Sequence, residues 1–298
     1  MDHSQDHRSE LRGIALAAGA AVAFGTLGIF AKYAYRAGAD PLPLLAVRFA
    51  IATALLAALQ AVRKDKETAT RPQITRLLLL GGFGYAFEAT LFFAALENAP
   101  AGIVGLVFYS YPLWTSLLGL ATRLEPYRPQ LIVALILGSA GVMLVFSIPS
   151  TNVKGPLLAL GAALAVAVYL IAIQVATRGV EAITSALWTS AGAALTTGVA
   201  ALVSGQSFPL AALGPAVALG LASSIAFVAL YGAIARLGSS RSAIATMLEP
   251  VTTVLLAALL LSEPLSWRIA AGAALVVSAL PVLALTAGRR EVNAPPLG

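Results

Sequence analysis

Apolar stretches about as long as a bilayer is thick recur along the whole sequence, and only short polar breaks separate them. A helix needs about 20 consecutive apolar residues to cross the hydrocarbon core of a membrane. The composition agrees, since 59% of the 298 residues are hydrophobic and only 11% are charged, against about 25% charged in soluble proteins. These features predict an all-α membrane protein with many spans.

Nine short breaks rich in Gly, Pro, Ser and charged residues divide the chain into ten predicted transmembrane helices. Five helices precede the break "SIPSTNVKG" and five follow it. The predicted organisation is a tail at 1–12, a five-helix unit at 13–146, a linker at 147–155, a second five-helix unit at 156–287 and a tail at 288–298.

Lys and Arg are distributed unevenly between alternate loops. With the N-terminus placed in the cytoplasm, most of them fall on the cytoplasmic side, including the cluster in loop 63–76, and Arg36, Lys154 and Arg268 fall outside. Because cytoplasmic loops carry the excess of basic residues, both termini are predicted to be cytoplasmic. The short loops and the abundance of Ala and Leu favour a bacterial inner membrane as the location.

The two halves of the chain share a pattern of prolines. Pro112 aligns with Pro250, and Glu125 aligns with Glu263, each glutamate being followed by a proline, at one constant offset without a gap. Matches of Leu and Ala arise easily in apolar sequence, whereas aligned prolines do not, so we infer an internal repeat. Because each unit has five helices, the second unit must enter the membrane upside down. Inverted repeats are typical of secondary transporters, whose substrate site lies near the midplane between them.

Two basic residues, Lys32 and Arg48, fall within predicted helices near the outer ends of those helices. Long basic side chains at such positions can extend their charged ends to the membrane interface. Alternatively, one of them contacts an anionic group of a substrate, such as a carboxylate, because ionisable residues within spans usually face the interior and serve function.

Two acidic residues, Glu88 and Glu249, also lie within predicted spans. Glu88 shares a helix face with Tyr85 and Phe92, so it could hold an ammonium group by charge and by cation–π contact. The alternative is a salt bridge to one of the two basic residues, which would only fix two helices together.

Glutamates and prolines at the ends and interruptions of the predicted helices indicate a bend or gate at some positions and helix caps at others. Pro112, Glu249 and Pro250 are predicted to form a bend or gate, since Pro250 removes a backbone donor and frees the carbonyl four residues earlier. An acid at such a bend could take part in gating, bind a proton or accept hydrogen bonds from a neighbouring helix. Glu125 and Glu263 lie where helices end, before prolines suited to the first turn of the next helix, so both are predicted helix caps.

Aromatic side chains inside the spans are candidates for lining a cavity, although many aromatics in membrane helices are packing residues or interface anchors. A mostly apolar pocket with a few polar anchors suits a small amphipathic molecule. The predicted cavity residues are Tyr85, Trp114, Trp188 and Tyr231, with Gln174 and Ser224 as additional hydrogen-bonding groups.

The residues that most catalytic and metal sites need are missing from the predicted spans. The histidines, His3 and His7, are in the tail, the aspartates are in loops or the tail, and the chain has no cysteine. Without clustered acids or imidazoles to hold a cation, and without a phosphate-binding loop, we expect neither a metal, nor a cofactor, nor enzymatic activity. The expected partners are a small-molecule substrate and the lipid bilayer, without nucleic acid, and with the chain as a monomer.

The stretch 235–265, "ARLGSSRSAIATMLEPVTTVLLAALLLSEPL", and the Glu-Pro after the fourth and ninth predicted helices resemble the EamA-type branch of the drug/metabolite transporter superfamily. The resemblance covers about residues 13 to 287, and it is greatest to the YddG-like exporters of aromatic and other amino acids. It implies a secondary transporter that exports small metabolites, above all amino acids, by alternating access. The alternatives are an exporter of drugs or nucleoside-like metabolites and, against the short loops, a receptor that does not transport.

Overall fold

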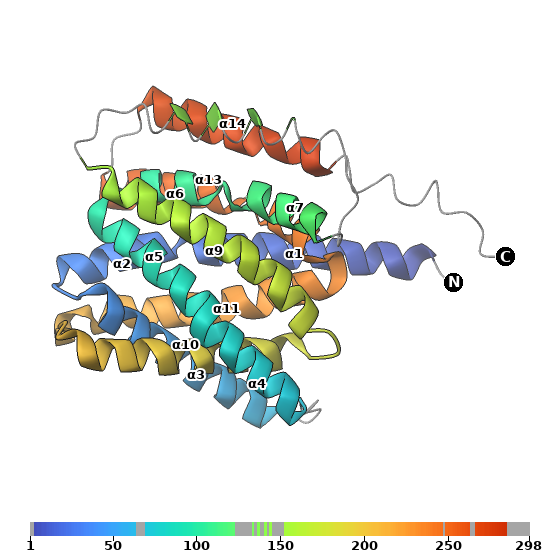
Figure 1. The fold of residues 1–298 in the computed structure, drawn as a ribbon, viewed down its shortest axis with the longest axis horizontal. Helices are drawn as coiled ribbons and strands as arrows, with labels where there is room; N and C mark the ends of the chain where they lie inside the picture. The colour runs from blue at the N-terminus through green and yellow to red at the C-terminus, as the bar shows by residue number, and fades with distance from the viewer. Residues whose placement is uncertain are drawn as a thin grey trace.

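The computed structural model describes residues 3–63, 69–122, 152–246, 248–262 and 266–284, with scattered residues between 133 and 144, and this part of the chain is built from helices (Figure 1). In chain order they are α1 (His3–Gly25), α2 (Leu27–Arg36), α3 (Pro41–Val62), α4 (Arg71–Leu79), the π-helix η1 (Leu80–Tyr85), α5 (Ala86–Asn98), α6 (Ala101–Phe108), α7 (Tyr111–Ala121), α9 (Lys154–Ala176), α10 (Ala182–Ser204), the 3₁₀ turn η2 (Leu210–Ala212), α11 (Leu213–Leu237), α12 (Ser239–Ala245), α13 (Leu248–Leu261) and α14 (Trp267–Ala284).

Seven helical segments of the described chain are long and apolar enough to cross a membrane. They are 11–36, 41–62, 71–98, 101–121, 154–176, 182–204 and 210–237. The predicted fifth helix falls almost wholly outside the described residues, as do the predicted caps Glu125 and Glu263. The total of ten helices therefore stays a prediction.

Large apolar side chains cover the outside of the helices. Leu202, Val203 and Leu259 expose 87%, 81% and 76% of their surface. Soluble monomers seldom expose apolar patches of large extent, but hydrocarbon chains are as apolar as leucine and solvate such a surface. The outer surface of the described helices is thus suited to lipid.

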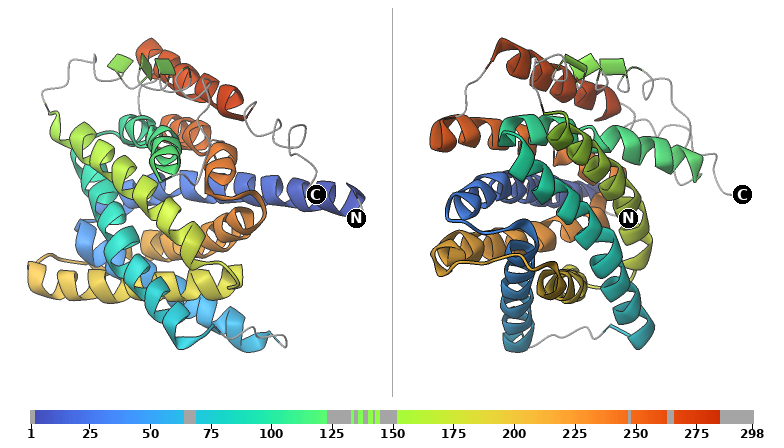
Figure 2. Two further views of the ribbon diagram at one scale, coloured as in Figure 1. Left: turned by 45° about the vertical axis from the view of Figure 1, so that its right-hand side comes forward. Right: turned by 60° about the vertical axis from the view of Figure 1, so that its left-hand side comes forward.

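The helices run across the molecule between two ends (Figures 1 and 2). At one end, where α3 and α11 finish and α10 starts, the described basic residues include Arg63, Arg178 and Arg236. At the other end lie Arg36 and Lys154. We call the first of these the basic end; it is the end that the sequence predicts to be cytoplasmic.

Two helices are interrupted close to the two aligned prolines, Pro112 and Pro250. One helix breaks between α6 and α7, and Pro112 starts α7 as one of its first two residues. The other breaks between α12 and α13, where the Thr246 carbonyl accepts a hydrogen bond from the Glu249 amide at 3.0 Å. α6 starts and α13 ends beside α2, so the two broken helices run in opposite directions, as inverted repeats require (Figure 1).

Glycines bring α10 unusually close to the helix formed by α4 and η1. A Cβ atom on Gly81 would lie 1.9 Å from the Thr189 carbonyl oxygen, and one on Gly192 would lie 2.1 Å from that of Leu78. Small residues allow such close backbone approach, which strengthens van der Waals packing in membranes. Gly81 is itself part of the π-helix η1, which ends at Tyr85, so the contact lies a few residues before Tyr85 and Glu88 in the chain.

Candidate functional site

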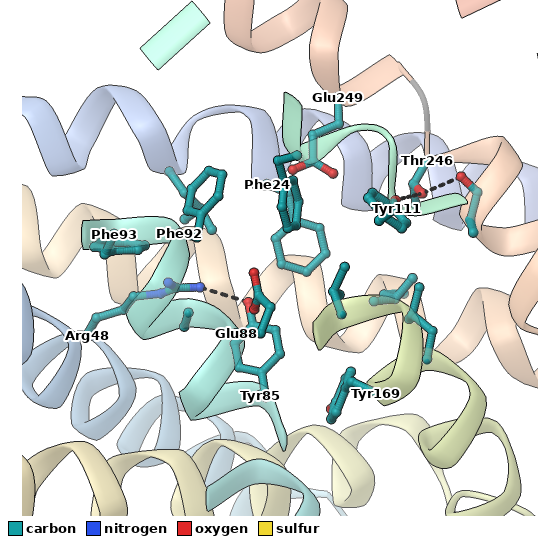
Figure 3. A pocket seen from close by; sticks show the side chains of 17 residues that line it. Phe24, Arg48, Tyr85, Glu88, Phe92, Phe93, Tyr111, Tyr169, Thr246 and Glu249 are labelled. Carbon is teal, nitrogen blue, oxygen red and sulfur yellow. Dashed lines mark hydrogen bonds between the residues drawn. The ribbon is translucent and has the colours of Figure 1, made fainter. Parts of the chain in front are cut away.

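A cavity lies among α1, α3, α5, α9 and the broken helices, and Figure 3 shows its lining from close by. Most of the wall is apolar, and seven of its side chains are aromatic: Phe24, Tyr85, Phe92, Phe93, Phe108, Tyr111 and Tyr169. The polar side chains besides these tyrosines are Arg48, Glu88, Thr246 and Glu249.

Arg48 is held on one side of the cavity by contacts from two other helices. Its Nε donates a hydrogen bond to Ser223 Oγ at 2.7 Å, and its Nη2 donates one to the Tyr85 hydroxyl at 3.2 Å. The guanidinium carbon also lies 4.7 Å from the centre of the Phe49 ring and 5.0 Å from that of Phe93, which are cation–π distances. Only 1% of the residue is exposed, so Arg48 does not reach the membrane interface.

The carboxylates of Glu88 and Glu249 enter the cavity from different helices (Figure 3). Both residues are buried, with 3% and 7% of their surface exposed. Among the described residues Glu88 makes no ion pair, although the Arg48 charge acts on it. Glu249 interacts with the Tyr109 hydroxyl and is close enough to Glu88 for their charges to interact. The cavity therefore combines a guanidinium with two carboxyl groups.

Hydroxyl groups connect the two broken helices next to Glu249. The Tyr111 hydroxyl lies 2.9 Å from Thr246 Oγ1, and the Tyr109 hydroxyl lies 3.2 Å from Thr253 Oγ1. Thr253 Oγ1 also lies 3.2 Å from the Gly25 carbonyl oxygen, where α1 ends. Hydrogen bonds thus join the end of α1 and the two broken helices, α6–α7 and α12–α13, near their interruptions.

The structure brings together part of the predicted site. Arg48, Tyr85, Glu88 and Glu249 line the cavity. Tyr231 does not line the cavity itself, but its hydroxyl is hydrogen-bonded to the hydroxyl of Tyr169, which does.

The other predicted residues lie away from the cavity. Lys32 Nζ donates to the Ala99 carbonyl at 2.6 Å near the end of α5, and Trp114 Nε1 donates to Ser110 Oγ at 3.2 Å. Gln174 accepts hydrogen bonds from Ser239 at the start of α12. Ser224 donates to the Gly220 carbonyl within its own helix, and Trp188 packs against the core.

Several lining residues are not predicted from the sequence. Phe24, Phe93 and Phe108 line the cavity, and Ser223 rather than its neighbour Ser224 contacts Arg48. Phe108 directly precedes the break between α6 and α7. Proximity to Pro112 was the signal that could have found Phe108, whereas nothing local distinguishes Phe24 or Phe93 from other aromatic residues in apolar helices.

The model of the EamA-like transporter family matches the chain twice, at residues 11–147 and 153–285. A search of curated proteins finds no relative that matches. The solved structures similar to this chain include a crystal structure of a protein with 25% sequence identity and a TM-score of 0.70, and the match covers 94% of this chain and 99% of that chain. The two family matches support an architecture of two repeats.

The two family matches, the apolar helices and the oppositely directed breaks agree with one another. The chain therefore belongs to the EamA-like transporter family, as a multi-pass membrane protein and transporter of the drug/metabolite type built from two copies of the family repeat.

Proposed function

We propose that the protein exports small metabolites, above all amino acids and related zwitterions, with preference for those that carry an aromatic or other apolar side chain. The observation that supports this is the combination in one cavity of a guanidinium, two carboxyl groups and seven aromatic rings. A free amino acid carries one anionic and one cationic group close together, and each requires a partner of opposite charge when it leaves water.

Arg48 is the proposed partner of the substrate carboxylate. A guanidinium has five N–H donors in a planar fork that fits a carboxylate. The hydrogen bonds to Ser223 and Tyr85 occupy two of its nitrogen atoms. These contacts hold the fork in place before the substrate arrives, which lowers the entropy cost of binding.

Glu88 is the proposed partner of the substrate ammonium group. Its carboxylate is buried beside Phe92 and Tyr85 on the cavity wall. A cation between a carboxylate and aromatic ring faces gains both a charge–charge and a cation–π interaction. The remaining rings would then surround the substrate side chain.

Transport is proposed to follow alternating access in a ten-helix monomer of the bacterial inner membrane, with both termini in the cytoplasm. In inverted-repeat transporters, broken helices lie at the substrate site and the two units move as bodies around it. Here the breaks before α7 and α13 carry Tyr111 and Glu249 to the cavity. The breaks are therefore the proposed points at which the units bend.

A cationic drug or nucleoside-like metabolite is the second candidate substrate. The cavity contains two carboxyl groups but only one guanidinium, and aromatic rings surround them. This excess of acidic groups would also suit an organic cation that has no carboxylate. The two proposals differ in one chemical group of the ligand, so ligand pairs can separate them.

Binding of matched ligands to the purified protein tests the proposal. We expect phenylalanine or tryptophan to raise the unfolding temperature in proportion to the logarithm of concentration above Kd, and the corresponding decarboxylated amine to bind at least about tenfold more weakly. Tighter binding of the amine would favour the organic cation. If neither the amino acids nor the amines bind while a nucleoside does, the amino-acid proposal is contradicted.

A further inference from the structure

The lining of the central cavity carries its guanidinium and its hydrogen-bonded pair of hydroxyls in different places. Figure 3 shows Arg48 on one side of the cavity, and Tyr111 with Thr246 on the opposite side. We call the part of the wall formed by Tyr111 and Thr246 the hydroxyl side. Glu88 lies between the two sides in the same view. A substrate whose two charged groups are held by Arg48 and Glu88 therefore directs its side chain toward the hydroxyl side.

The hydroxyl proton of Thr246 is used within the protein. α12 ends at Ala245, and the last carbonyl groups of a helix need partners from outside the helical pattern. Thr246 Oγ1 supplies one, because it donates to the Ala243 carbonyl at 3.0 Å. A threonine hydroxyl has a single proton, so Thr246 has none left for a second hydrogen bond.

The hydroxyl proton of Tyr111 is used in the same way. The Tyr111 hydroxyl lies 2.9 Å from Thr246 Oγ1. Since the proton of Thr246 points to Ala243, Tyr111 is the donor in this pair, and its own oxygen keeps only lone pairs. Both side chains line the cavity. The hydroxyl side can therefore accept a hydrogen bond from a ligand but has no proton to donate.

Glu249 adds a second acceptor next to the hydroxyl side. It lies three residues after Thr246, and its amide donates to the Thr246 carbonyl at 3.0 Å. Its carboxyl group lies at the cavity wall (Figure 3), and an ionised carboxyl group accepts hydrogen bonds but donates none. The hydroxyl of Tyr169, another lining residue, is bonded to that of Tyr231.

We propose that the hydroxyl side selects substrates whose side chain ends in a hydrogen-bond donor, so that a phenol or an indole is preferred to a phenyl ring. A phenol O–H or an indole N–H that leaves water needs an acceptor, and the Tyr111 oxygen and the Glu249 carboxylate provide one. A site built to pair with a substrate hydroxyl discriminates strongly against an analogue that lacks it. This preference rests on the proposed transport of amino acids and extends it to the substrate side chain, with Tyr111 as the residue that sets it.

Ligands of similar size that differ in their protons test this preference. Para-fluorophenylalanine resembles tyrosine in shape, but its fluorine carries no proton, whereas para-aminophenylalanine carries a donor at the same position. We expect tyrosine and para-aminophenylalanine to bind the purified full chain at least about tenfold more tightly than para-fluorophenylalanine and phenylalanine. Equal Kd values for the four ligands, or tighter binding of the fluorine compound, overturn the proposal.

Removal of one hydroxyl tests the assignment to Tyr111. In Tyr111→Phe, the Kd for para-fluorophenylalanine divided by that for tyrosine should fall at least about threefold. Tyr33→Phe is the matched control, because the Tyr33 hydroxyl donates to the Leu260 carbonyl at 2.9 Å and Tyr33 does not line this cavity; there the ratio should stay as it is. An unchanged ratio in Tyr111→Phe contradicts the assignment. The ligand comparison uses the unaltered chain, so it decides the preference even if a variant fails to fold.

Decarboxylated ligands separate the preference from the amino-acid proposal. Tyramine and para-fluorophenethylamine differ in the same way as tyrosine and para-fluorophenylalanine, but neither has a carboxylate. If the amines bind and the amino acids do not, the amino-acid proposal fails, and the ratio of the two amine Kd values decides the donor preference. Binding of none of these amino acids and amines overturns both proposals.

Discussion

At the scale of single residues, Arg48 is a buried charge that its neighbours hold in one orientation. A charge inside a membrane helix is costly, and this one is almost completely buried. Its surroundings offset the cost, because Arg48 donates hydrogen bonds to Ser223 and Tyr85 and lies against the faces of Phe49 and Phe93. Four residues that orient one guanidinium indicate that its direction matters as well as its charge.

Arg48→Lys tests the importance of that direction. The lysine keeps the positive charge but loses the planar fork, so we expect substrate affinity to fall about tenfold to a hundredfold. Ser223→Ala removes one supporting hydrogen bond and should weaken binding by less, about threefold to tenfold. Titration of both purified variants with the substrate measures the difference. Unchanged affinity in Arg48→Lys would mean that the guanidinium serves folding alone.

The two carboxyl groups are expected to differ in role. Glu88 makes no ion pair among the described residues, whereas Glu249 interacts with Tyr109 at a helix break. Glu88→Gln should therefore weaken binding of an amino acid about tenfold, since it removes the partner of the ammonium group. Glu249→Gln should keep Kd within about threefold and slow transport. Equal losses of affinity in the two variants would contradict this division.

At the scale of secondary-structure elements, interruptions of helices position the site. Prolines in the sequence predicted the breaks before α7 and α13, because a helix cannot continue its hydrogen bonds through them. The break at Thr26 and the π-helix at 80–85 have no proline, and neither was predicted. The glycines at 81, 82 and 84 favour irregular backbone and close packing, but which helix would pack there depends on the tertiary fold.

The glycine contact between α10 and η1 predicts stability effects of single methyl groups. Gly81→Ala and Gly192→Ala each place a Cβ atom about 2 Å from a backbone oxygen of the facing helix, so the helices must move apart. We expect each to reduce the free energy of unfolding by about 2 kcal/mol or more. Thermal unfolding of the variants in detergent measures the change.

Gly198 provides the control on the same helix. A Cβ atom there meets nothing within 4 Å, and alanine is the better helix former by about 1 kcal/mol. Gly198→Ala should therefore leave stability unchanged or raise it. If Gly81→Ala and Gly198→Ala behave alike, the close contact does not contribute to the fold.

At the scale of the whole molecule, the sequence predicted the class and the repeat better than the site. Periodic apolar runs and aligned prolines are local signals, and the family model matches the chain in two copies, at 11–147 and 153–285, as an internal repeat requires. The cavity is a product of tertiary packing. Charged residues in spans are rare enough to be recognised individually, which is why Arg48, Glu88 and Glu249 were found. Aromatic residues are common, so Trp114 and Trp188 could not be distinguished beforehand from Phe24 or Phe108.

Efflux from liposomes tests directly whether the protein exports amino acids. Purified protein is reconstituted into liposomes loaded with labelled phenylalanine or tryptophan, and release is followed without ATP, with Arg48→Lys and protein-free liposomes alongside. The account predicts release at least tenfold faster than from protein-free liposomes, reduced in Arg48→Lys and inhibited by other amino acids. Release no faster than from protein-free liposomes for every amino acid tested, from a sample that transports an organic cation or nucleoside, would contradict it.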